Sequence, residues 1–238
     1  MRGIVLAEIT VGQHPRFSFF GIEMNRDTVV STLVAGAVLI GLGLIMRRQL
    51  SPDGVPGKLQ LTFEALVKYI EDLVEEAMGI KAPAFVVPLG VSLFAFILIA
   101  NYVEVLPSHE ELIAPTSDIN LPAALAVLVL GIVHLTGIKR KGAVGYVKSF
   151  MGAPYWLVPF RAIEEVAKPL SLALRLFGNL FAGGLMIALI GLLPWVFVSV
   201  PLKSVWVIFD MFIGLIQALI FSLLTVVYLS AAVSEEGH

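Results

Sequence analysis

Long apolar stretches alternate with short polar ones along this chain, and their lengths predict membrane-spanning helices. A hydrocarbon core about 30 Å thick is crossed by roughly 20 residues of α-helix. The predicted crossings are 29–46, 84–103, 119–138, 160–200 and 205–233. The last two exceed a straight crossing, so we expect long, tilted helices there. An N-terminal segment, 1–28, precedes the first crossing and is expected on the outer side.

Residues 58–78, between the first two crossings, show an amphipathic helical pattern. Their charged side chains recur at steps of three and four opposite an apolar stripe. The charged positions are Glu64, Lys68, Glu71, Asp72, Glu75 and Glu76. We expect this helix to lie along the membrane surface or to pack on a neighbouring subunit. Its acidic face argues against anionic lipid as its main partner.

The composition narrows the class of protein further. Of the 238 residues, 58% are hydrophobic and only 14% are charged, which is far from a soluble domain. The net charge of −2 argues against a nucleic-acid partner, and the absence of cysteine excludes disulfides and thiolate metal sites. The chain has no phosphate-binding, dinucleotide-binding or nucleophile-elbow motif. We therefore expect one all-α polytopic membrane domain that is not catalytic by itself and has no cofactor or metal.

The basic residues predict the orientation of this domain. Arg47 and Arg48 follow the first crossing, and Lys139, Arg140 and Lys141 follow the third. Lys and Arg concentrate in cytoplasmic loops, whereas the loop 108–118 contains neither. The N-terminus is therefore expected outside and the C-terminus in the cytoplasm.

Charged residues in the fourth predicted crossing share one helical face. An ionisable residue at mid-bilayer costs about 2.5–3.5 kcal/mol on insertion scales, and it usually faces a partner or a wet path. The residues at steps of three and four are Arg161, Glu165, Lys168, Leu172, Arg175 and Asn179, with Glu164 beside them. The charged residues before Arg175 have an alternative interpretation as interfacial side chains near the cytoplasmic end.

The Arg175 side chain cannot extend to the membrane interface, because leucines and phenylalanines surround it in the sequence. Its guanidinium stays protonated at physiological pH, so it is a fixed positive charge and not a proton carrier. No acidic residue lies within one turn on its own face. Its counter-charge must come from another segment or another chain, and a structural ion pair is the alternative.

The last predicted crossing carries polar residues on one face as well. Asp210, Gly214 and Gln217 follow at steps of four and three. A carboxylate in apolar surroundings suits a proton relay, although Asp210 could also be an interfacial residue at a helix start. Gln217 could instead make an interhelical hydrogen bond. Asp118 opens the third crossing, where it is either a helix N-cap or part of an outer polar path.

Several segments together resemble one known family. The stretch KPLSLALRLFGNLFAGG (168–184) resembles the signature of subunit a of F-type ATP synthases. GKLQLTFEAL (57–66) resembles the family's surface helix, SDIN (117–120) the start of its third crossing, and IQALIFSLLTVVYLS (216–230) its last helix. The AGG after the arginine is most similar to actinobacterial members.

The resemblance implies a function and partners. It implies a stationary proton-translocating subunit of the plasma membrane that works with a ring of c subunits, a b-subunit stalk and the rest of the F1Fo complex. Arg175 would face the membrane carboxylate of the ring. Asn179 and Gln217 would lie near the arginine and the outer half-channel, and Asp118 at the outer side of that path.

Two departures from the family pattern affect the predicted path. Many members carry Glu or His at the position of Gly184, and many carry His or Glu at the position of Asp210. With Gly184 in place of Glu or His, the outer part of the predicted proton path keeps one titratable group on the last helix, Asp210. Glu164 and Glu165 lie about one turn from the position where several relatives carry a glutamate. The alternative function is a self-contained proton-coupled secondary transporter, in which Arg175 would bind an anionic substrate.

Overall fold

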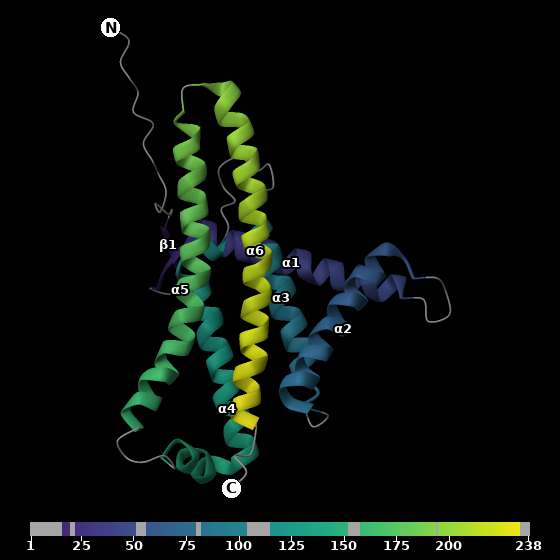
Figure 1. Cartoon of the computed structure of the whole chain (residues 1–238), viewed down its shortest axis with the longest axis vertical. Helices are drawn as coiled ribbons and strands as arrows, with labels where there is room; N and C mark the ends of the chain where they lie inside the picture. The colour runs from purple at the N-terminus through teal and green to yellow at the C-terminus, as the bar shows by residue number, and fades with distance from the viewer. Residues whose placement is uncertain are drawn as a thin grey trace.

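The computed structural model describes residues 16–19, 22–50, 56–79, 82–103, 115–151, 158–193 and 195–233. Helices dominate these residues (Figure 1). The elements are β1 (Arg16–Phe19), β2 (Ile22–Asn25), α1 (Arg26–Gln49), α2 (Lys58–Met78), α3 (Val86–Tyr102), η3 (Pro115–Ser117), α4 (Asn120–Met151), α5 (Val158–Gly191) and α6 (Val196–Val233).

The expected class, an all-α polytopic membrane protein, is confirmed. Four of the described helical segments are long and apolar enough to cross a membrane: Arg26–Gln49, Asn120–Tyr146, Ala173–Gly191 and Val196–Val233. The helix α3 is also apolar but has only 17 residues, or about 25 Å at 1.5 Å per residue. That is slightly less than the thickness of the hydrocarbon core, so α3 reaches across only with its flanking residues.

A short antiparallel hairpin precedes α1, and the hydrophobic pattern does not predict it. Arg16 pairs with Asn25 and Phe19 pairs with Ile22 in β1 and β2. Asn25 is also the residue directly before α1. The hairpin therefore ends where α1 begins, within the segment expected to be an outer extension.

The predicted border between the last two crossings is wrong. The pattern places it at residues 201–204, but α5 ends at Gly191 and α6 begins at Val196. Pro194 follows the end of α5 in the sequence, and a proline disfavours helical geometry in the residue before it. Pro201 lies inside α6, near its N-terminal end. The break between α5 and α6 therefore falls before the predicted border, on the N-terminal side of Pro201.

The glycines and prolines of residues 142–159 predict an irregular connection after the third crossing, and the structure contradicts part of this prediction. Gly142 adopts a φ of 72°, which kinks the chain, and the residues after it form a further helical segment up to Met151. Tyr146 from this segment folds back against Gly137, and its hydroxyl lies 2.6 Å from Nδ1 of His134. The kink at Gly142 thus reverses part of the chain, so that the segment after it packs against the helix before it.

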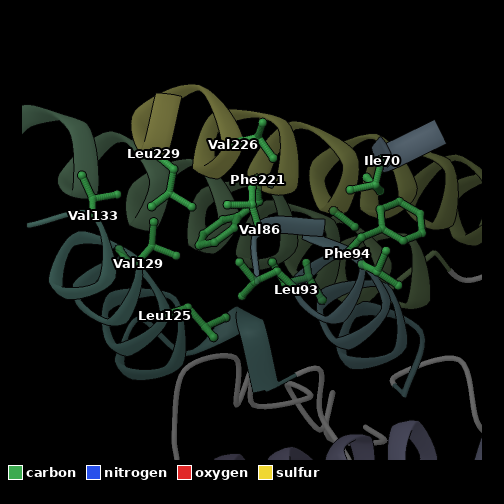
Figure 2. Close-up of a cluster of buried hydrophobic side chains, with 14 of the residues drawn as sticks. Ile70, Val86, Leu93, Phe94, Leu125, Val129, Val133, Phe221, Val226 and Leu229 are labelled. Atoms are coloured by element: carbon green, nitrogen blue, oxygen red, sulfur yellow. The ribbon is translucent and has the colours of Figure 1, made fainter. Parts of the chain in front are cut away.

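The packed centre of the molecule lies between α3, α4 and α6, with α2 at one side (Figure 2). Phe221, Val226 and Leu229 of α6 meet Val86 and Phe94 of α3 there. Within lipid, close packing and hydrogen bonds hold helices together, because lipid tails are as apolar as the side chains. Gly90 permits such an approach, since a Cβ there would lie 2.9 Å from Ile70, and its carbonyl accepts a 2.9 Å hydrogen bond from Ser222.

The helices α5 and α6 run side by side along the length of the molecule, whereas α1 crosses them at a steep angle (Figure 1). With 38 residues, α6 is about 57 Å long, nearly twice the thickness of the hydrocarbon core. Helices arranged in this way cannot all stand perpendicular to the membrane. The tilt expected for the last two helices stays a prediction, and the length of α6 supports it.

Candidate functional site

The polar faces predicted for α5 and α6 meet each other. The two helices are antiparallel neighbours joined by a short connection (Figure 1). The Asn179 side chain donates a 3.1 Å hydrogen bond from Nδ2 to Oε1 of Gln217. Gln217 is almost fully buried, while Asn179 is exposed on α5. The pair therefore links the interior of the bundle to its outer surface.

Asp210 lies further along the same pair of helices, directly over the backbone of α5. A Cβ built on Gly183 would lie 2.8 Å from Cγ of Asp210 and 3.1 Å from its Oδ2. Trp206, one turn earlier on α6, donates a 3.2 Å hydrogen bond from Nε1 to the Gly183 carbonyl. Half-buried Asp210 thus sits where only a glycine on α5 leaves room for its carboxylate.

Arg175 points away from the packed side of α5. Its neighbours Ala173 and Leu176 are buried, whereas Arg175 itself is exposed. Among the residues that the structure describes, none forms a hydrogen bond or ion pair with Arg175. A structural ion pair within this part of the chain is therefore not observed.

The predicted residues before Arg175 are only partly described. Glu164 is exposed on α5, eleven positions before Arg175. The backbone of Glu165 and Lys168 belongs to α5, but their side chains, like that of Arg161, lie outside what the structure describes. Glu164 and Asp210 nevertheless lie toward opposite ends of α5 relative to Arg175, because Asp210 contacts Gly183, eight positions after the arginine.

Asp118 lies just before α4 and is held by a set of hydrogen bonds. Its Oδ2 accepts bonds of 2.6 Å from Thr28 and 2.8 Å from Asn25, and its Oδ1 accepts a 3.1 Å bond from the backbone N–H of Asn120. Burial acts to raise the pKa of this carboxyl, but the hydrogen bonds outweigh it and hold the pKa below its usual value. Asp118 therefore caps α4 and also ties it to α1.

A buried network of hydrogen bonds lies beside the site, and its residues are not among those predicted for the site. Asn101 of α3 donates a 3.0 Å hydrogen bond to the Gly214 carbonyl and accepts a 2.8 Å bond from Thr116. Tyr102 donates a 3.1 Å bond to the Met211 carbonyl. These bonds fix the part of α6 between Asp210 and Gln217. The signal in the sequence was an asparagine within an apolar crossing.

The described residues contain no group of three or more His, Asp or Glu side chains placed to hold a metal ion. The polar groups of α5 and α6 instead form a line: Asp210 beside Gly183, the Asn179–Gln217 pair, then Arg175 and Glu164. Such a line of titratable, amide and fixed-charge groups can carry protons or orient a carboxylate, but it contains no nucleophile with an activating base.

Comparisons with known proteins agree on one family. The family model described as ATP synthase A chain matches residues 29–230. ATP synthase subunit a of Mycobacterium bovis is 44% identical over 99% of this chain and 98% of that protein. ATP synthase subunit a of Acidothermus cellulolyticus is 40% identical over 99% of this chain and 87% of that protein. ATP synthase subunit a of Coxiella burnetii is 36% identical over 90% and 86% of the two chains.

Proposed function

The chain belongs to the ATP synthase A chain family, and from this premise we propose that the polar line along α5 and α6 is its proton path. As a member of this family, it is a multi-pass membrane component of an F-type ATP synthase and acts in proton translocation. The resemblance stated from the residues 168–184, including its actinobacterial character, is confirmed. The observation that carries the assignment of residues is the exposed Arg175 next to the Asn179–Gln217 pair.

Arg175 acts as the fixed charge that separates the two halves of the path. Leucines and phenylalanines flank Arg175 in α5, and its exposed guanidinium needs an anion from outside this chain, because leaving it alone in lipid is costly. A membrane carboxylate on a ring of c subunits supplies that anion. The arginine attracts the ionised carboxylate and blocks direct passage of protons from one half to the other.

The outer half-channel leads past Asp118 toward Asp210, Asn179 and Gln217. Asp210 is the titratable group that passes protons to the ring, and the Asn179–Gln217 pair orients water or the incoming carboxylate beside it. Asp118 has a lowered pKa and stays ionised near neutral pH, so its role at the entrance is that of a fixed acceptor.

The inner half-channel lies at the other end of α5, at Glu164, Glu165 and Lys168. Glu164 is separated from Arg175 by eleven residues, which is about 16 Å along a helix. A protonated ring carboxylate turns through lipid without a bare charge and releases its proton at this end. Each proton that moves across 100 mV supplies about 2.3 kcal/mol, so several protons are coupled to one ATP.

The assembly and the orientation follow from the same proposal. The chain has no catalytic role of its own and works against the c-ring, held by the b-subunit stalk, in the plasma membrane. Its N-terminus lies outside and its C-terminus in the cytoplasm, with the basic ends of α1 and of the membrane part of α4 on the inner side. No observation on this chain favours the self-contained transporter.

The test is acid-driven ATP synthesis in inverted membrane vesicles that contain the assembled complex with Arg175→Ala. We expect coupled synthesis to be lost while the complex still assembles, because the separation of the half-channels depends on this one charge. Lys203→Ala is the matched control, since it also removes one exposed cation, near the start of α6, and should leave synthesis unchanged. Normal coupled synthesis with Arg175→Ala would show that the arginine is only a structural group.

A further inference from the structure

A cleft of about 440 Å³ lies away from the proton path, between the start of α3 and the basic end of the membrane part of α4. Its walls are apolar and include Pro83, Phe85, Ile132 and Leu135. Lys139 and Arg140 line it as well, and both are exposed. The cleft therefore combines an apolar interior with two cationic groups, and none of its lining residues is acidic.

The helix that forms most of this cleft carries positive charge only. Lys139, Arg140, Lys141 and Lys148 belong to α4, and its sequence from Asn120 to Met151 contains no aspartate or glutamate. Lys139, Arg140 and Lys141 are consecutive, so this end of the crossing carries a concentration of positive charge. An anionic ligand is therefore favoured over a neutral or cationic one.

The apolar walls continue onto the exposed surface of the membrane crossing. Val127, Leu128 and Leu135 of α4 are 66%, 53% and 61% exposed, and they lie on one helical face because seven or eight residues make two turns. Lys139 follows Leu135 by one turn on the same face. An occupant that enters the cleft can thus extend an apolar part along α4 within the hydrocarbon region.

We propose that this cleft binds an anionic phospholipid. The phosphate lies against Lys139 and Arg140, and an acyl chain follows Leu135 and the face of α4 beyond it. Clefts of basic residues between membrane helices on the cytoplasmic side suit anionic headgroups. A soluble anion would use only the two cations and would leave the apolar walls exposed to water, so it fits the cleft less well. The proposal does not depend on the proton path.

The test is photocrosslinking in lipid nanodiscs that contain the intact ATP synthase. Phosphatidylglycerol with a photoreactive acyl chain is the probe, and labelled peptides are mapped by mass spectrometry. We expect labelling at residues 132–138 and near Phe85, and much weaker labelling from phosphatidylcholine with the same chain. Each cation near the surface contributes an effect of about fivefold in affinity, so Lys139→Gln and Arg140→Gln should each lower labelling about that much.

The matched control is the pair Lys141→Gln and Lys148→Gln, which removes the same charge from the same helix without touching the cleft lining. An equal loss of labelling in this control would overturn the site, because the effect would then come from the general surface potential. Equal labelling by the two lipids, or full displacement of phosphatidylglycerol by millimolar inorganic phosphate, would overturn it too. The conservative Lys139→Arg should keep the labelling, which separates lost charge from disturbed folding.

Discussion

The carboxylate of Asp210 occupies the space where a side chain on Gly183 would lie. In helix interiors glycine costs about 1 kcal/mol relative to alanine, so its presence in α5 needs a packing reason. The close approach of Asp210, reinforced by the Trp206 hydrogen bond to the same residue, supplies one. The position of Asp210, which we propose passes protons to the ring, thus depends on the missing Cβ of Gly183.

We predict that Gly183→Ala lowers acid-driven ATP synthesis about ten- to hundredfold, because it moves the Asp210 carboxylate out of line with the path. Asp210→Asn should slow proton entry to a similar extent, and the double variant should be little worse than either single one. The measurement is the synthesis rate in inverted vesicles. Gly131→Ala is the control, since a Cβ there meets nothing within 4 Å, and it should have little effect. Fully additive losses would contradict a shared mechanism.

The lowered pKa of Asp118 contributes to the stability of the folded chain. A carboxyl whose pKa is lowered in the folded state adds stability above its unfolded pKa of about 3.9, and this contribution is lost as the pH falls through the lower folded value. Asp118 is therefore ionised throughout the neutral range. Its hydrogen bonds to Asn25, Thr28 and Asn120 hold α1 and α4 together.

We predict that Asp118→Asn destabilises the subunit by about 1.5–3 kcal/mol, because hydrogen bonds to a charged acceptor are lost. The pH profile of ATP synthesis between about pH 6 and 8 should keep its shape, since the removed group does not titrate in that range. Thermal dissociation of the purified complex and the pH profile are the two measurements. Asp72→Asn on the exposed face of α2 should change neither. A shifted profile would instead make Asp118 a proton carrier.

At the scale of elements, the sequence predicts helices well where their ends carry a local signal. The pattern predicts a helix over 58–78, and α2 has these bounds, with Gly57 and Gly79 on either side. Gly79 has a φ of 68°, a conformation that suits glycine at a helix end. Between α5 and α6 the sequence offers two prolines, and hydropathy alone does not say which one interrupts the helix.

Contacts between elements could not be predicted in the same way. Helical periodicity predicts which face of α5 and which face of α6 is polar, but the Asn179–Gln217 bond joins residues 38 positions apart. The partners of Asn101 lie on η3 and α6, the latter 113 positions away. A helical pattern gives the face of a residue and not the neighbour that this face meets. The polar residues were therefore predictable one by one, and their pairing was not.

We predict that Asn101→Ala loosens α6 from α3 and lowers stability by about 1–3 kcal/mol, because the buried Thr116 hydroxyl and the buried Gly214 carbonyl lose their hydrogen bonds. The loss should appear as a lower temperature of thermal dissociation of the complex, with reduced synthesis as a consequence. Ser204→Ala is the control, since the exposed Ser204 donates a hydrogen bond to the Val200 carbonyl of its own helix. Unchanged stability of Asn101→Ala would mean that the network is not needed to hold α6.

At the scale of the whole molecule, function requires the two ends of α5 to open toward opposite sides of the membrane. The C-terminal part of α4, which contains Lys139 to Lys141 and Lys148, lies at the same end of the molecule as the C-terminal end of α6, whereas α5 ends and α6 begins at the opposite end (Figure 1). If the first end faces the cytoplasm, Glu164 lies toward the inner side and Asp210 toward the outer side of Arg175. The orientation of the chain thus decides the direction of proton flow.

We predict that a membrane-impermeant maleimide labels Lys148→Cys in inverted vesicles and Lys203→Cys only in right-side-out vesicles. The chain contains no cysteine, so each variant carries one reactive thiol, and both replace an exposed lysine. Wild-type vesicles give the background, and permeabilised vesicles show that both thiols can react. Labelling of Lys203→Cys from the inverted side would reverse the orientation. The assignment of Asp210 to entry and Glu164 to release would then have to be exchanged, while the role of Arg175 between them would stand.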